Sequence, residues 1–167
     1  TFVIFERAYS DLLRRLGSTE STSASHPDRL AKMWAEREPL YIHLTRSADQ
    51  FWIAEKDGKP IGFSRSIVRG RLRELTELFV LPGQQSGGIG RELIQRAFPE
   101  DESDYRAIIA TTDVRAQVLY LKAGVYPRFS MNYFGKEPAS RNVSADLDAR
   151  PMETITAVSY THLRAHE

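Results

Sequence analysis

Hydrophobic residues recur at helical spacing near the start of the chain, which predicts two helices there. Over residues 5–16 the apolar positions fall three or four apart, as on one face of a helix, and Gly17 ends the run. Residues 18–25 are rich in serine and threonine and predict a loop. A second helix is predicted over 27–37, where apolar residues again share one face.

Short apolar runs follow, and these predict three strands. Residues 51–54 and 61–67 form two of them, and the Asp57-Gly58 pair between them is typical of a tight hairpin turn. The third strand is predicted over 74–81. A meander of consecutive strands is therefore expected in the middle of the chain.

The pattern then alternates between helix and strand. Residues 88–98 predict a helix that ends at Pro99, 107–110 a strand, 114–123 a helix and 130–134 a last strand. The order of two helices, three strands, helix, strand, helix and strand contains no internal repeat. It predicts a domain of the α/β or α+β class built around a sheet.

The end of the chain departs from this pattern. Residues 137–157 are polar and lack a sustained period, which predicts a linker or the start of another domain. Residues 158–167 resemble a translated sequencing-adaptor tail, and we expect them to be non-native. The folded domain is thus predicted over 1–136.

Length, charge and hydropathy narrow the function classes. A chain of 167 residues fits one ordinary domain, and its 23 Lys and Arg against 22 Asp and Glu give a net charge of +1. This balance gives no electrostatic reason to expect nucleic acid or an anionic membrane as a partner. The sequence shows no run of 18 apolar residues and no signal-peptide pattern, so a cytoplasmic protein is expected.

The residue types that bind metals are scarce. Cysteine is absent, which excludes disulfides, thiolate zinc sites, iron–sulfur clusters and cysteine nucleophiles. The four histidines form no H-x-x-x-H or H-E-x-x-H pair. No metal is therefore predicted.

The glycines between the strand at 74–81 and the helix at 88–98 are the most informative feature. Backbone N–H groups in such a turn, together with a helix N-terminus, can bind an anion such as a pyrophosphate. A P-loop is excluded because Arg91 rather than Lys follows Gly90. A Rossmann turn is disfavoured because its pattern G-x-G-x-x-G requires a third glycine, and Leu93 stands at that position. Two interpretations stay open, an acyl-CoA turn with the pattern Q-x-x-G-x-G and a loop that only reverses the chain.

Three segments resemble the GCN5-related N-acetyltransferase (GNAT) family, in the family's order. Residues 78–94 resemble its acyl-CoA motif, and 113–125 resemble the segment that follows, in which Asn-x-x-Ala-x-x-Leu-Tyr leads to Gly-Phe. The hairpin at 57–63 is also typical. The likeness covers about 51–134. It implies an acetyl-CoA-dependent enzyme with a mixed, mostly antiparallel sheet, splayed at the acetyl-CoA site and flanked by helices.

The family's first strand, before the first helix, has no counterpart here, so an N-terminal truncation is expected. In the family, the strand before the glycine turn pairs with the pantetheine arm, and the N–H groups of the turn hold the pyrophosphate. The resemblance carries cofactor-binding roles to Leu78, Phe79, Val80, Gln85, Ser86, Gly87, Gly88, Ile89, Gly90, Arg91 and Asp113. Asp113 stands where the family has Asn, and its alternative role is to cap the helix that begins at 114. Val125 replaces the usual Phe, which predicts a local change in packing.

Catalytic roles are implied for two residues. Tyr120 matches the family's general acid, with a core tyrosine as the alternative, because it lies on an apolar helical stripe. Glu77 matches a general base that acts through water, and its alternation with Leu75 and Phe79 predicts that the three share a face. Apolar neighbours would raise the pKa of Glu77 toward neutrality, whereas the alternative is a solvated carboxylate.

These residues predict an N-acetyltransferase that moves the acetyl group directly to the amine of a small molecule or peptide, without an acyl-enzyme. Residues 133–138 resemble the joint between the halves of a tandem GNAT protein, so a second GNAT domain or a homodimer is the expected partner. A non-catalytic acyl-CoA-binding module is the first alternative. A domain without any ligand is the second.

Overall fold

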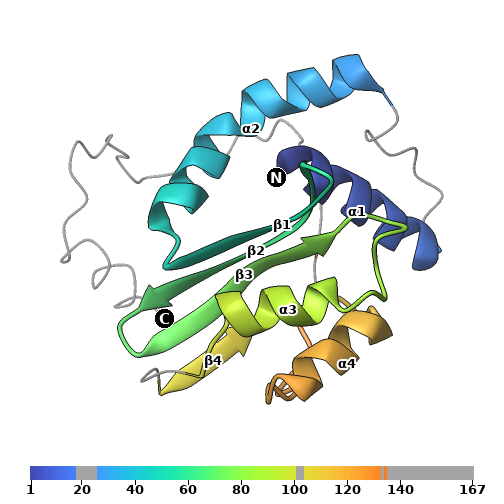
Figure 1. Ribbon diagram of the computed structural model, residues 1–167. Helices are drawn as coiled ribbons and strands as arrows, with labels where there is room; N and C mark the ends of the chain where they lie inside the picture. Colours follow the sequence, from blue (N-terminus) through green and yellow to red (C-terminus); the bar gives the residue numbers. More distant parts are fainter. Residues whose placement is uncertain (18–25, 101–103, 133, 135–167) are drawn as a thin grey trace, which may run out of the picture. The chain divides into compact units, whose positions relative to one another are not determined.

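The computed structural model describes residues 1–17, 26–100, 104–132 and 134 (Figure 1). The helices are α1 (Phe2–Arg15), α2 (Pro27–Ser47), α3 (Ile89–Ala97) and α4 (Val114–Lys122), and the strands are β1 (Gln50–Lys56), β2 (Lys59–Arg69), β3 (Leu72–Val80) and β4 (Tyr105–Ile108). The chain divides into two compact units, Thr1–Phe129 and Ser130–Glu167, and all of these elements belong to the first. Their order is the one that the sequence predicts as far as α4.

The strands form one mixed sheet in the order β1-β2-β3-β4. The first three are antiparallel neighbours, and β4 joins β3 in the parallel sense after the crossover through α3. The hairpin between β1 and β2 turns at Asp57 and Gly58, whose φ angles of 52° and 69° are those of a type I′ turn. The predicted mixed, mostly antiparallel sheet is confirmed.

A bulge in β3 lies at the point where β3 and β4 separate. Arg65 of β2 pairs with Glu77, but the next residue of β2 pairs with Leu75, so Thr76 is the extra residue. Pairing between β3 and β4 ends with Leu75 and Ile108. Beyond that point β3 continues to Val80 without a partner on its β4 side in the described part of the chain.

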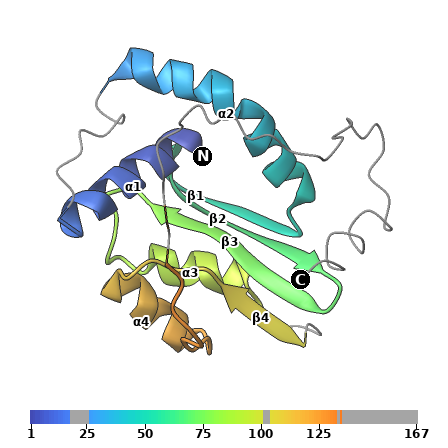
Figure 2. The ribbon, with the colours of Figure 1, turned by 180° about the vertical axis from the view of Figure 1, so that it is seen from behind.

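Helices cover both faces of the sheet (Figures 1 and 2). On one face α3 packs over β1, β2 and β3, and a core of Leu75, Ile94, Ala97 and Phe98 lies between α3 and the sheet. A Cβ on Gly62 would lie 3.0 Å from the carbonyl oxygen of Phe79, so this glycine permits close packing. On the other face α1 packs against β2 and β3.

The structure corrects two of the predicted elements. Helix α2 continues to Ser47 rather than ending at residue 37, and Pro39 lies inside it. Packing outweighs the cost of that proline, because Tyr41 is buried with its ring 5.6 Å from that of Phe2. The predicted strand at 130–134 is wrong for the residues of it that are described, which form no strand, while Tyr133 lies outside the described residues. The predicted linker at 137–157 and the tail at 158–167 lie wholly outside them.

Candidate functional site

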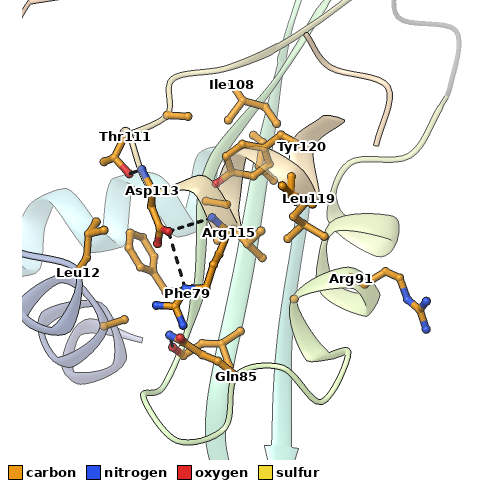
Figure 3. Close-up of a pocket in the computed structure, with 18 of the residues that line it drawn as sticks. Leu12, Phe79, Gln85, Arg91, Ile108, Thr111, Asp113, Arg115, Leu119 and Tyr120 are labelled. Carbon is orange, nitrogen blue, oxygen red and sulfur yellow. Dashed lines mark hydrogen bonds and ion pairs between the residues drawn. The ribbon is translucent and has the colours of Figure 1, made fainter. Parts of the chain in front are cut away.

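A pocket of about 680 Å³ lies where β3 and β4 diverge (Figure 3). Its walls come from α1, from β3, from the glycine turn, from the end of β4 and the chain that follows it, and from α4. The splay creates this space, since two strands that stayed paired would close it. The pocket joins most of the residues to which the sequence assigns a binding or catalytic role.

The β3 wall presents backbone rather than side chains. Phe79 packs its ring against Phe5, 5.0 Å away between centroids, on the face that α1 covers. Leu78 instead packs against the core beneath α3. Because the two side chains occupy opposite faces, the backbone groups of residues 76–80 that point away from β2 lie at the open edge, where an extended ligand can pair with them.

The glycine turn forms one end of the pocket. Gly88 is the N-cap of α3 with φ of 85°, a left-handed conformation that favours glycine. The first hydrogen bond of the helix runs from the Glu92 N–H to the Gly88 carbonyl, so the N–H groups of residues 89–91 have no acceptor within the helix. Such an N-terminus attracts anions.

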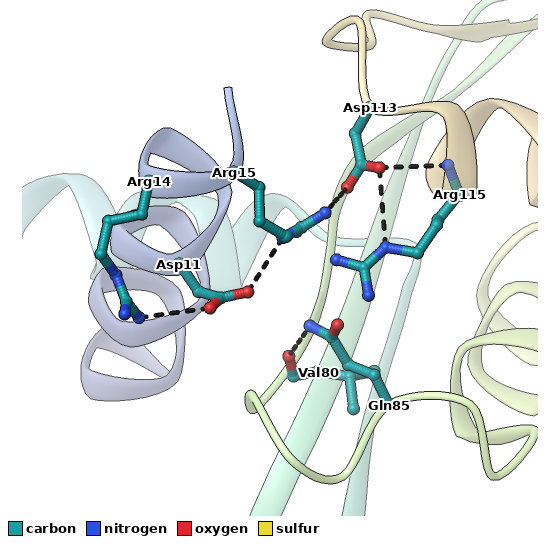
Figure 4. A network of polar contacts seen from close by, with 7 residues as sticks. All are labelled: Asp11, Arg14, Arg15, Val80, Gln85, Asp113 and Arg115. Carbon is teal, nitrogen blue, oxygen red and sulfur yellow. Dashed lines mark hydrogen bonds and ion pairs between the residues drawn. The ribbon is translucent and has the colours of Figure 1, made fainter. Parts of the chain in front are cut away.

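The side chains of the turn have different placements. The Gln85 amide donates to the Val80 carbonyl at 3.0 Å and so ties the turn to the end of β3 (Figure 4). Gln85, Ser86, Gly88, Gly90 and Arg91 line the pocket, and Figure 3 shows the Arg91 side chain directed away from Gln85 and Asp113. Gly87 and Ile89 line a second hollow, beside β1.

Asp113 caps α4, as its alternative interpretation predicts. Its carboxylate accepts from the Arg115 N–H at 3.0 Å and from the Arg15 guanidinium of α1 at 2.8 Å (Figure 4). Burial alone would raise the pKa of Asp113, but these two hydrogen bonds outweigh burial and hold it below its ordinary value. The carboxylate is therefore ionised at neutral pH and joins α1 to α4 at the rim of the pocket.

We expect replacement of Asp113 by alanine to lower the free energy of unfolding by about 1 kcal/mol, the usual loss for a helix cap. Asn at this position keeps the cap and is the matched control. Because the folded pKa lies below the ordinary value of 3.8, the stabilisation is complete above that pH and disappears as pH falls through the folded pKa. Urea unfolding at pH 7 and pH 3 measures the difference, and an alanine variant as stable as the parent at pH 7 would contradict the cap.

Tyr120 combines its two predicted roles. Its ring packs beside the core formed by Leu75, Ile94 and Phe98, as a core tyrosine would. Figure 3 shows its hydroxyl directed into the pocket, and the described residues offer it no hydrogen bond. Burial, and to a lesser extent the charge of Asp113, raises the pKa of Tyr120, so the phenol keeps its proton at neutral pH.

Glu77 also lines the pocket, but it is not the solvated carboxylate of the alternative interpretation. Its side chain is 11% exposed and forms an ion pair with the Arg65 guanidinium of β2. Burial raises the pKa of Glu77, and the charge and hydrogen bond of Arg65 oppose that rise. The net direction is upward, toward the range in which a carboxylate can accept a proton at neutral pH.

The predicted shared face of Leu75, Glu77 and Phe79 is wrong for Leu75. The bulge at Thr76 shifts the alternation by one residue, so Leu75 packs beneath α3 while Glu77 and Phe79 lie on the α1 face. Sequence reasoning also missed Arg65 and Arg15 as partners of the site. Arg65 stands between two serines in a strand that reads as central, but only the register shows that it faces Glu77.

Two findings concern absences in the part of the chain that is described. Those residues bring together no group of three or more His, Cys, Asp or Glu that could hold a metal ion. Their helices include none with the length and apolar character needed to cross a bilayer.

Comparison with known proteins gives a family match and one curated relative. The sequence profile of the acetyltransferase (GNAT) domain matches residues 47–125. The peptidyl-lysine N-acetyltransferase YiaC of Escherichia coli (strain K12) is 40% identical over 76 residues, which are 46% of this chain and 50% of that protein. The chain thus spans about half the length of the curated relative it matches.

Solved structures share the fold. The PaiA N-acetyltransferase of Thermoplasma acidophilum, determined in complex with coenzyme A, aligns with a TM-score of 0.55 at 16% identity, over 73% of this chain and 79% of that one. A GCN5-related N-acetyltransferase of Ralstonia eutropha JMP134 aligns with a TM-score of 0.52 at 23% identity, over 78% and 88%. At these identities the likeness concerns the arrangement of helices and strands.

Proposed function

We propose that the chain transfers an acetyl group from acetyl-CoA to a primary amine, because residues 47–125 match the acetyltransferase (GNAT) domain, the family that its three motifs resemble. The observation that carries the proposal is the free edge of β3 beside the turn at Gly88. This edge can pair with an extended amide-containing arm, and the adjoining helix N-terminus can hold the phosphates to which that arm is joined.

The pocket suits acetyl-CoA in shape and in donor chemistry. Along residues 76–80, the backbone N–H and C=O groups that point away from β2 can pair with the two amides of a pantetheine arm. The N–H groups of residues 89–91 lie at the end of the same edge, where a pyrophosphate would follow the arm. Leu78, Phe79 and Val80 therefore act through their backbones, and Gln85 acts by bracing the turn.

Two side chains would perform the proton transfers of a direct reaction in a ternary complex. Glu77 takes a proton from the substrate ammonium, and the amine nitrogen that results forms its C–N bond with the thioester carbonyl as the C–S bond breaks. Tyr120 gives its phenolic proton to the departing sulfur and regains one from the nitrogen. Proton balance is then complete, with one proton released to Glu77 and from there to water.

Acceptors of two classes carry the primary amine that the proposal requires. The curated relative is named as a peptidyl-lysine N-acetyltransferase, and its likeness to this chain supports a lysine side chain in a peptide as the first acceptor to test. Small-molecule amines form the second arm of the test. Both present the same primary amine to Glu77 and Tyr120.

We expect the purified chain to bind CoA in calorimetry and to release free thiol from acetyl-CoA when a suitable amine is present. A panel of lysine peptides and small amines, monitored by thiol release and by mass spectrometry of the acceptor, measures the activity. Binding without turnover on any acceptor would favour the non-catalytic acyl-CoA module. Absence of CoA binding would reject the proposal.

A further inference from the structure

Arg65 is a buried cation in the middle of the sheet, and it contacts the carboxylate that we propose as the base. Its exposed fraction is 0%, and its Nη1 donates to Thr45 Oγ1 of α2 at 3.0 Å. Its Nε and Nη2 both approach Oε2 of Glu77. Oε1 of Glu77 makes no hydrogen bond within the described part of the chain, so the guanidinium holds this carboxylate through one oxygen only.

Aromatic rings enclose the guanidinium of Arg65. Its central carbon lies 5.1 Å from the ring centroid of Phe51, 5.5 Å from that of Tyr41 and 5.6 Å from that of Phe63. These contacts are favourable for a cation and keep water away from it. The ion pair with Glu77 therefore lies in surroundings of low dielectric, where it is stronger than at a surface.

We propose that Arg65 is a positioning residue for acetyl transfer, because it holds Oε2 of Glu77 and leaves Oε1 to receive the proton of the substrate amine. The inference rests on the proposed function. In the proton transfer an N–H bond of the ammonium breaks, its electron pair stays on nitrogen, and the proton bonds to Oε1. Arg65 stays protonated throughout, since guanidinium does not lose its proton in proteins.

Charged groups around Glu77 determine how it responds to the loss of Arg65. The titratable and charged groups that face this carboxylate or its immediate neighbours are Arg65 of β2, Tyr41 and Arg37 of α2, Glu6 of α1, and the amino group of Thr1, which precedes α1. Glu6 and Arg37 pair with each other at 2.7 Å. Of these groups, Arg65 contributes most to opposing the rise that burial causes in the pKa of Glu77.

Removing the charge of Arg65 should therefore move the titration of Glu77 to higher pH. We expect Arg65→Met, which keeps an unbranched apolar chain in the enclosure, to raise the midpoint by about one pH unit or more. Arg65→Lys retains the charge, although it cannot reproduce the two-nitrogen contact, and should restore part of the difference. The titration of the Glu77 carboxyl carbon by NMR, in the full chain, measures both shifts without any enzyme assay.

Kinetic measurements test whether the shift in the titration of Glu77 changes the pH dependence of acetyl transfer. The acidic limb of kcat/KM against pH should move upward with the NMR midpoint in Arg65→Met and return part of the way in Arg65→Lys. A strongly basic amine that stays protonated over the whole range keeps the acceptor's own titration out of the profile and still requires Glu77 to remove a proton from the ammonium. The Kd for CoA should stay within about twofold of the parent value, because Arg65 does not line the pocket.

A purely structural ion pair gives a different result. It would lower the melting temperature of Arg65→Met but leave the acidic limb at its original pH, and this would overturn the inference. An unchanged NMR midpoint in Arg65→Met would overturn it too. If that variant does not fold, Arg65→Lys alone decides, since a midpoint and a limb at the parent pH contradict the inference. Failure of the unaltered chain to acetylate any amine is a separate observation and rejects the proposed function itself.

Discussion

Replacing Tyr120 with phenylalanine is expected to lower kcat by about 10²- to 10⁴-fold, the usual effect of removing a positioned general acid. The ring remains, so its packing beside Leu75 and Phe98 is preserved. The phenolic proton is lost, and with it the group that protonates the departing sulfur. The Kd for CoA should change little, because backbone groups of β3 and of the turn hold the cofactor under our proposal.

Three measurements on this variant separate the two roles of Tyr120. Turnover should fall strongly, whereas CoA affinity and melting temperature should change only a little. Tyr126→Phe is the matched control, because Tyr126 is 67% exposed and does not line the pocket. Normal turnover in Tyr120→Phe with reduced stability would instead assign Tyr120 to the core alone, and a silent Glu77→Gln would then favour the non-catalytic module.

Replacing Gly88 with valine is expected to weaken CoA binding by about 100-fold or more. The residue has φ of 85°, and a β-branched side chain in that region costs about 1–3 kcal/mol, so the turn should relax away from its present conformation. The N–H groups of residues 89–91 would then no longer point to one place. A side chain at Gly88 would also obstruct the approach of a phosphate to the backbone.

Calorimetry with CoA measures this loss of affinity. Gly70→Val is the matched control, since Gly70 also has a left-handed φ, of 57°, and open space around it, but lies at the turn between β2 and β3, away from the pocket. Both variants should lose stability, and only Gly88→Val should lose the ligand. Equal CoA affinity in the two variants would remove the glycine turn from the binding site.

The sequence predicts most of the fold because its periodicity is local information. Hydrophobic spacing and turn residues locate every described element as far as α4, and the Asp57-Gly58 turn gives the hairpin. The end of α2 was missed because Pro39 is a local signal against helix, whereas the burial of Tyr41 that overrides it depends on tertiary contacts. The predicted strand at 130–134 rests on apolar residues that the structure leaves exposed, such as Met131 and Phe134 at 65% and 87%.

The features of the site also separate into those that local sequence predicts and those that depend on tertiary contacts. The glycine turn, the Asp113 cap and the position of Tyr120 follow from motifs and spacing. The partner of Glu77 does not, because Arg65 is 12 residues away and faces it only in a register that includes the bulge at Thr76. A strict alternation of two places Leu75 on the wrong face for the same reason.

The strands join the sheet through different connections, and we expect its parts to differ in local stability as a result. Strands β1, β2 and β3 are connected by tight hairpins, so their pairing closes only short loops. Strand β4 pairs with β3 only after the crossover through α3, over four residue pairs that end at Ile108. We therefore expect the wall of the pocket formed by β4 and α4 to exchange its amide hydrogens before the meander does, as a unit that opens on its own. A ligand that fills the splay would then contribute to the cohesion of the domain, by bridging its most stable part to its least stable part.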